Sequence, residues 1–104
     1  MASIKKSNKA KQPVVPFNSK AYMRICKENH NLCFAKHQDY GPENIRQFGE
    51  LGIVMRMWEK IQRLYNLTWK NRQPVVNDES IENVYADVMN YCVIALMLRN
   101  NEWH

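Results

Sequence analysis

The sequence predicts a small all-α protein, a bundle of three to four helices that follows a basic N-terminal arm. Apolar residues recur at helical spacing in three long stretches, and no stretch shows the convincing alternation of a half-exposed strand. Two breakers separate these stretches: "DYGPEN", which contains Gly41 and Pro42, and "TWKNRQPVVND", which contains Pro74. A chain of 104 residues has room for one domain, which we place at residues 19–104.

Residues 1–18 are predicted to form a flexible basic arm, because Pro13 and Pro16 exclude a regular helix there. Residues 1–20 hold five lysines and no acid, so they account for the whole net charge of +5. Residues 21–104 hold ten basic and ten acidic side chains, which cancel. A DNA-reading domain should carry its positive charge on the fold. We therefore expect contact with nucleic acid only through the arm.

The first helix is predicted to run from Ser19, a suitable N-cap, to about Gln38. A single face of this helix collects the apolar and thiol side chains Tyr22, Ile25, Cys26, Leu32 and Cys33. We expect that face to pack against the rest of the domain.

The second helix is predicted to begin at Glu43 or Phe48 and to end near Leu67. Its apolar face carries six residues, namely Ile53, Val54, Met57, Trp58, Ile61 and Leu64, and Glu50 lies in the middle of it. Its polar face carries Arg56, Glu59 and Arg63, with Lys60 at the border.

The third helix is predicted to be capped by Asn77 or Asp78 and to end near Arg99. From Val84 onward nearly every residue is apolar, which is typical of a central, buried helix. One narrow stripe on this helix is polar. It consists of Glu79, Asn83, Asp87 and Asn90, with Glu82 beside it.

Asp87 is the residue of this stripe that helix-start chemistry does not explain. Acids in the first turn are favoured by capping and by the helix dipole, but Asp87 lies two turns further on. A carboxylate inside an apolar helix needs a cation. One interpretation is an ion pair with a basic residue of the second helix. The other is a seat for Mg²⁺, with Glu59 adding an oxygen and Lys60 and Arg63 holding phosphate.

Four blocks of the sequence resemble the nucleotide modification associated domain family of small phage and bacterial proteins. They are "DYG", "GELG", "EKIQRL" and "DESIENVYADVMNY", and Lys36 precedes the first of them. The resemblance covers roughly residues 30–98, and the last block is its most specific part. That family is similar to the all-α MazG-like and dUTPase-like nucleoside triphosphate pyrophosphatases. The resemblance therefore implies an all-α nucleoside triphosphate pyrophosphatase-like domain.

The resemblance also implies roles for individual residues. As metal ligands it implies Glu59, Glu79, Glu82 and Asp87, and as phosphate or nucleotide contacts Lys36, Lys60, Arg63 and Asn90. From the residues themselves we add Tyr40, Arg56 and Asn83 as nucleotide-binding candidates. Glu50, as an orienting base, joins Glu59 as a catalytic candidate, and a capping acid at a helix start is the alternative for Glu50. The implied cofactor is Mg²⁺, with Mn²⁺ as the alternative.

The first functional hypothesis is Mg²⁺-dependent hydrolysis of a nucleoside triphosphate to the monophosphate and pyrophosphate, in phage or bacterial nucleotide metabolism. The chain departs from the pyrophosphatase pattern at Gln62, Asn83 and Val84. The second hypothesis is therefore a protein that binds a nucleotide or signal nucleotide without hydrolysing it. The third is a helical nucleic-acid-binding protein that uses its lysine arm.

The remaining expectations concern partners and location. The three cysteines, Cys26, Cys33 and Cys92, have no zinc-type spacing, and the first two are expected in the core. No apolar run reaches 18 residues and no secretion signal is visible, so we expect no membrane contact. We place the protein in a bacterial cytosol or, for a phage protein, in the host cytoplasm. We expect a (d)NTP substrate and a homodimer or homotetramer.

Overall fold

A computed structural model describes residues 14–69 and 80–104, and all of the regular structure within them is helical. The all-α expectation is thus confirmed. The elements are α1 (Ser19–Tyr40), α2 (Glu43–Arg46), α3 (Gly49–Thr68) and α4 (Ile81–Arg99). Most of the predicted basic arm lies outside the described residues. The three apolar residues of its last part, Val14, Val15 and Phe17, are exposed.

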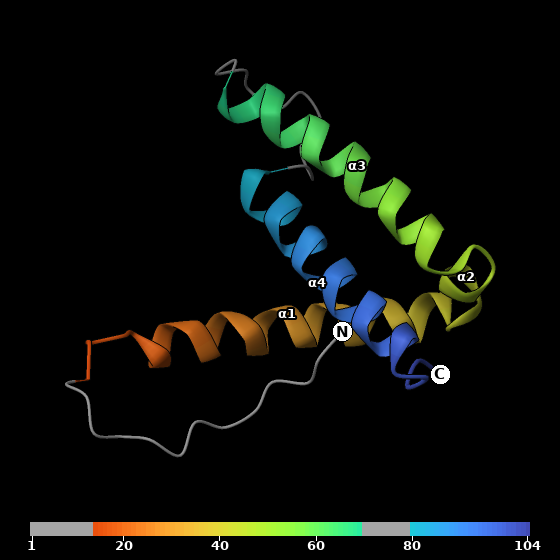
Figure 1. Cartoon of the computed structure of the whole chain (residues 1–104), viewed down its shortest axis with the longest axis horizontal. Coiled ribbons are helices and arrows are strands. Elements are labelled where there is room, and N and C mark those ends of the chain that lie inside the picture. Colours follow the sequence, from red (N-terminus) through yellow and green to blue (C-terminus); the bar gives the residue numbers. More distant parts are fainter. Residues whose placement is uncertain (1–13, 70–79) are drawn as a thin grey trace.

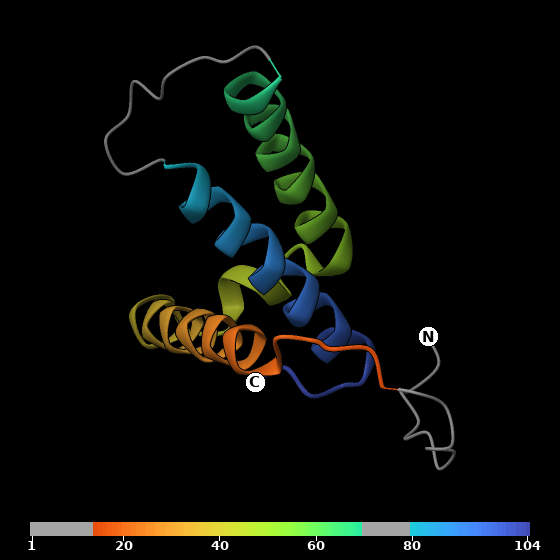
Figure 2. The ribbon, with the colours of Figure 1, turned by 90° about the vertical axis from the view of Figure 1, so that its left-hand side faces the viewer.

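Helices α3 and α4 run antiparallel, side by side, and α1 crosses them as a separate layer (Figures 1 and 2). The second half of α1 lies against α4, whereas its first half extends past the end of the pair (Figure 1). The short α2 turns the chain from α1 back into α3. This arrangement leaves a space bounded by α1 on one side and by the α3–α4 pair on the other.

The N-cap of α1 lies one residue earlier than the sequence suggested. The N-cap is Asn18, whose side-chain oxygen accepts a hydrogen bond from the backbone N–H of Ala21 at 3.0 Å. Ser19 is instead the first helical residue. The helix ends at Tyr40, two residues later than expected, where Gly41 adopts a φ of 72° and its N–H bonds to the His37 carbonyl. Glycine takes this left-handed conformation without steric cost.

The second predicted helix corresponds to α3, which begins within one residue of the Phe48 alternative, whereas residues from Glu43 form the separate α2. Gln47 and Phe48 form the break between them. Gly49, the first residue of α3, has a φ of 59°, a conformation that is costly for a residue with a β-carbon. Glu50 follows at the start of α3, and its carboxylate accepts a bond from Nε of Arg99 at 2.9 Å. This ion pair ties the first turn of α3 to the last turn of α4, and it accounts for an acid on an otherwise apolar face.

Helix α4 is capped by Ser80 rather than by Asn77 or Asp78, which lie outside the described residues. The Ser80 hydroxyl accepts from the backbone N–H of Asn83 at 3.2 Å. At the other end Asn101 adopts a φ of 59°, its N–H bonds to the Leu98 carbonyl and that of Glu102 to the Met97 carbonyl. These two bonds are those of a Schellman motif, and they turn the chain back toward the helices.

The buried core is small. Of the described residues, those that are buried are Ile45, Ile53, Leu64, Leu67, Val84 and Ile94. Several residues predicted to pack are exposed instead, namely Tyr22, Ile25 and Leu32 of α1 and Val54, Trp58 and Ile61 of α3. Helix α4 is likewise not buried all round, since Tyr85 and Val93 are 56% and 45% exposed. Each apolar face is wider than the part of it that neighbouring helices cover.

Candidate functional site

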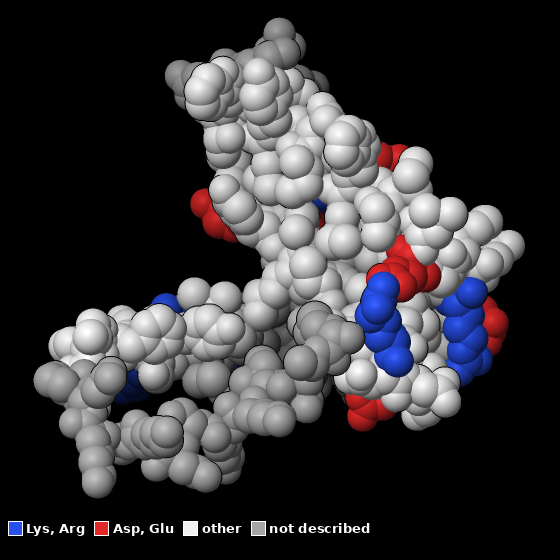
Figure 3. All heavy atoms as spheres, viewed as in Figure 1, with Lys and Arg blue, Asp and Glu red and all other residues white. Residues whose placement is uncertain are grey.

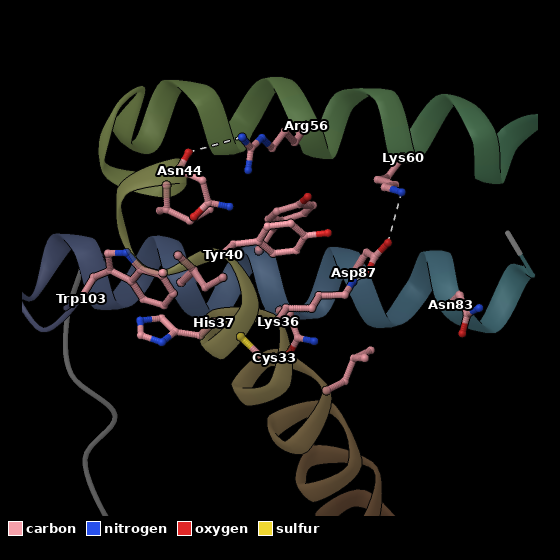
Figure 4. A pocket seen from close by; sticks show the side chains of 16 residues that line it. Cys33, Lys36, His37, Tyr40, Asn44, Arg56, Lys60, Asn83, Asp87 and Trp103 are labelled. Carbon is pink, nitrogen blue, oxygen red and sulfur yellow. Dashed lines mark hydrogen bonds and ion pairs between the residues drawn. The ribbon is translucent and has the colours of Figure 1, made fainter. Parts of the chain in front are cut away.

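A pocket of about 580 Å³ lies between α1, α3 and α4 (Figure 4). Its volume is in the range of pockets that hold small molecules. Seven of the sequence-predicted site residues line it. They are Lys36 and Tyr40 from α1, Arg56 and Lys60 from α3, and Asn83, Asp87 and Asn90 from α4. The polar stripe of α4 therefore forms one wall of this pocket.

Asp87 joins the three long helices at one point. Its Oδ1 accepts a hydrogen bond from Nζ of Lys36 at 2.9 Å, and its Oδ2 lies 3.1 Å from Nζ of Lys60. The Asp87 side chain is 19% exposed, so these ion pairs are partly shielded from water. The arrangement matches the ion-pair interpretation of Asp87, with one partner on α3 as expected and a second on α1.

The two lysines govern the protonation of Asp87. Partial burial alone would raise the pKa of its carboxyl group, but hydrogen bonds and charge from Lys36 and Lys60 outweigh burial and hold the pKa below its ordinary value. Cys33, on the same pocket, behaves differently. Burial raises the pKa of its thiol, and the nearby charge of Lys36 opposes that shift only in part. Asp87 is therefore charged at neutral pH, and Cys33 is a neutral thiol.

The opposite end of the pocket is aromatic. Trp103 follows the turn at the end of α4, and its indole Nε1–H donates to the Pro42 carbonyl at 3.1 Å. Its ring meets the His37 ring edge to face, with centroids 5.1 Å apart. Tyr40 lies between this end and the Lys60–Asp87 end (Figure 4). Its side chain is largely exposed, at 69%, so the phenol ring is accessible to a ligand.

Arg56 and Asn44 form the upper wall between these two ends (Figure 4). A guanidinium N–H of Arg56 donates to the backbone carbonyl of Asn44 at 3.4 Å, which is a long hydrogen bond. This contact leaves most of the guanidinium donors and the Asn44 amide for other partners. Both side chains can therefore offer hydrogen bonds to a molecule in the pocket.

The other predicted site residues lie elsewhere. Glu59 and Glu82 are exposed on α3 and α4, and neither lines the pocket. Glu50 is paired with Arg99, as described above, and Arg63 is half-buried on α3 outside the pocket lining. Glu79 lies outside the described residues.

The donor set does not by itself make a metal cage. In residues 14–69 and 80–104 no three His, Cys, Asp or Glu side chains come together as they would around a metal ion. Both carboxylate oxygens of Asp87 are engaged by lysines. Mg²⁺ prefers several oxygen ligands in octahedral geometry. Along the described part of the pocket, the side-chain oxygens on the α4 wall are the carboxylate of Asp87, the amides of Asn83 and Asn90 and the hydroxyl of Tyr91.

The charge of the pocket favours an anion. Its described lining holds three cationic side chains, Lys36, Arg56 and Lys60, against the single carboxylate of Asp87, which leaves a net charge of +2 with histidine neutral. Lysine and arginine are the usual partners of phosphate oxygens. Aromatic and amide groups stand within the same pocket.

His37, Asn44 and Trp103 also line the pocket, and the sequence had not singled them out. Helical periodicity carried no signal for Asn44, which lies in the short α2, or for Trp103, which follows the last helix. His37 follows Lys36 on α1 and is half-buried. The family-like block that begins at Lys36 was the one indication that this region contributes to a site.

Comparison with known proteins bears on the identity of the chain. No curated protein and no solved structure matches it. Similarity to MazG-like pyrophosphatases thus stays a prediction. Residues 36–98 match the family model described as nucleotide modification associated domain 1. This span begins at the pocket lysine of α1 and ends in the last turn of α4, and it contains all seven predicted pocket residues. The chain therefore belongs to the nucleotide modification associated domain 1 family.

Proposed function

We propose that the pocket between α1, α3 and α4 binds a nucleotide. The observation that carries this proposal is the convergence of Lys36, Arg56 and Lys60 on one pocket that also has an aromatic end. Phosphate groups of the nucleotide lie at the lysines. The base lies toward Tyr40 and Trp103, where a flat ring finds aromatic side chains and an amide. Membership of a family named for nucleotide modification supports this class of ligand.

Asp87 has a definite part in this proposal. In the free protein its carboxylate neutralises Lys36 and Lys60, at 2.9 and 3.1 Å, and so keeps two cations in place without a ligand. A polyphosphate entering the pocket competes for the same ammonium groups. Because a phosphate chain carries more charge than one carboxylate, it takes over these donors. Asp87 therefore holds the lysines in position and at the same time weakens the binding of phosphate.

Isothermal titration calorimetry tests the binding. The ligands are the ribo- and deoxyribonucleoside triphosphates and inorganic tripolyphosphate, each with and without Mg²⁺. We expect at least one nucleotide to bind, and Lys60→Ala to weaken that binding by about tenfold, the effect of about 1.4 kcal/mol lost with one charge-assisted contact. Lys27→Ala removes an exposed lysine of α1 outside the pocket and should change nothing.

A variant of Tyr40 tests the position of the base. Tyr40→Leu should weaken the binding of the nucleotide and leave the binding of tripolyphosphate unchanged, because only the nucleotide has a ring that can stack on Tyr40. Equal affinity of wild type and Lys60→Ala for every ligand, or no binding at millimolar concentration, would contradict the proposal.

As a second function we propose hydrolysis of the bound nucleotide between its α and β phosphates. One observation favours it: Asn83, Asp87 and Asn90 present carboxylate and amide oxygens along a single wall of the pocket. The test incubates the protein with each (d)NTP and Mg²⁺ or Mn²⁺ and measures pyrophosphate. Metal-dependent release supports hydrolysis. If no nucleotide yields pyrophosphate, hydrolysis is wrong and binding alone remains.

A further inference from the structure

A continuous apolar stripe covers the side of α3 that faces away from the core. Its members are Leu51, Val54, Met55, Trp58, Ile61, Tyr65 and Trp69, each between 46% and 79% exposed. At 3.6 residues per turn they occupy a band about 120° wide along the whole helix. No Asp, Glu, Lys or Arg falls within the band, whose one polar member among residues 51–67 is Gln62.

The stripe continues across the seam onto α4. The thiol of Cys92 lies 3.6 Å from the sulfur of Met57, which joins the two helices at this edge. Beyond Cys92, α4 exposes Tyr85, Val93 and Leu96. Figure 3 shows a largely uncharged surface over the middle of α3 and α4 on the face in view, with charged side chains at its margins. We call these ten apolar residues of α3 and α4 the outer face.

The size of the outer face exceeds what a monomer usually exposes. Trp58, Tyr65 and Trp69 are 64%, 47% and 79% exposed. With about 200 Å² for a whole aromatic side chain, these three alone expose about 400 Å². The largest apolar patch of a typical monomer is about 300–600 Å² in total. In an interface of standard size each partner buries about 800 Å² of its surface. With the other seven residues included, the exposed area of the outer face approaches that figure.

We infer that the outer face is the interface of a homodimer, in which the α3–α4 pair of one chain packs on that of a second copy. Two antiparallel helix pairs joined in this way form a four-helix bundle, with an apolar centre and the charged side chains outside. The uncharged composition fits a permanent interface, and a two-fold dimer buries the same patch on both chains. Few buried residues stabilise the single chain, and this interface supplies a larger core.

A lipid surface is the other occupant to consider, since α4 is long and apolar enough to cross a membrane by length and composition. Asp87 argues against a spanning α4, because its ion pairs with Lys36 and Lys60, on the opposite side of the same helix, would then lie inside the bilayer. Charged pairs at membrane depth are costly. The stripe on α3 also has too many charged neighbours for a spanning helix, among them Arg56, Glu59 and Arg63.

Light scattering after gel filtration of the full chain tests the dimer. We expect the wild type at twice the chain mass of 12.4 kDa, and Trp58→Glu at the mass of one chain. The charge falls in the middle of the stripe, where the second copy would bury it. Gln38→Glu is the matched control. It adds the same carboxylate at an exposed position of α1 away from the outer face, and it should remain a dimer.

A second measurement covers the case in which Trp58→Glu fails to fold. The Tm of a folded homodimer rises with protein concentration, whereas that of a monomer does not. We expect the wild-type Tm to rise over a hundredfold range of concentration. A wild-type mass of one chain together with a constant Tm would overturn the inference. So would flotation of a monomeric wild type with phosphatidylcholine–phosphatidylglycerol vesicles.

Discussion

Asp87 is the residue at which three helices meet. Its carboxylate contacts Lys36 of α1 and Lys60 of α3 from a position on α4, so one side chain holds two of the three cationic groups of the pocket. The Lys60 side chain is 22% exposed and that of Asp87 is 19% exposed. Removing one partner of such a partly buried pair leaves an uncompensated charge, which costs more than the loss of a fully exposed surface pair.

Replacing Asp87 by Asn separates its possible roles. Without the carboxylate, Lys36 and Lys60 no longer have a competing anion, so tripolyphosphate binding in the absence of metal should tighten about fivefold. Stability should fall by about 1–2 kcal/mol, because the two ammonium groups lose their counter-ion. Calorimetry and urea unfolding measure the two effects. Weaker binding of phosphate by Asp87→Asn would contradict the role of competitor and would favour a metal ligand.

The lowered pKa of Asp87 makes a prediction about acid. Since the carboxyl is more acidic folded than unfolded, its stabilising effect is complete above the ordinary aspartate pKa of about 3.9 and is lost as pH falls through that value and the lower folded one. The difference in free energy of unfolding between wild type and Asp87→Asn should therefore be smaller at pH 3 than at pH 7. A difference that stays constant over this range would show that folding does not lower the pKa of Asp87.

At the scale of the element, the ends of α4 position the pocket. Ser80 starts the helix, and Asn101 ends it in a left-handed conformation that directs Trp103 onto the pocket and the core. Most other residues with a β-carbon are strained in that conformation. The indole then contacts Pro42 and His37.

The end of α4 can be tested with neighbouring asparagines. Asn101→Ala should lower the free energy of unfolding by about 1 kcal/mol, because alanine disfavours a φ of 59°. Asn100→Ala, where φ is −88°, should cost less. Thermal unfolding of both variants makes the comparison. If Asn100→Ala proved the more harmful, the left-handed turn would not be what holds Trp103 in place.

The sequence predicted the helices more accurately than the contacts between them. Breakers at Gly41 and Pro42 placed the end of α1 within two residues, and the polar stripe of α4 placed Asn83, Asp87 and Asn90 on one wall. Lys36, which bonds Asp87, stands 51 residues away along the chain, and periodicity contains no signal for such a pairing. The family resemblance, rather than local pattern, drew attention to Lys36.

Packing was overestimated for a related reason. Val54, Trp58 and Ile61 lie on the apolar face of α3 and are exposed. Helical spacing predicts that such a face is buried, but it does not identify the element or chain that covers it. Within one chain α4 covers only part of it. A second copy would cover the remainder, so the prediction of burial and the observed exposure agree in a dimer.

At the scale of the whole molecule, the residues that carry the net charge are different from those that line the pocket. The net charge of +5 is carried by the lysines of residues 1–20, whereas the pocket has its own cations. Replacing Lys5, Lys6, Lys9 and Lys11 by alanine should leave nucleotide affinity within twofold of the wild type. Any salt-sensitive binding of DNA should disappear. Loss of nucleotide binding in this variant would show that the arm, rather than the pocket, holds the phosphates.

The central claim is that the pocket between α1, α3 and α4 holds a nucleotide, and nuclear magnetic resonance tests it directly. Titration of the isotope-labelled full chain with the nucleotide that binds best in calorimetry should shift the backbone amides around the pocket. The largest shifts are expected at Lys36, Tyr40, Lys60 and Asp87, with small ones at Trp58 on the outer face. Shifts centred on the outer face, or no shifts at millimolar nucleotide, would contradict the claim.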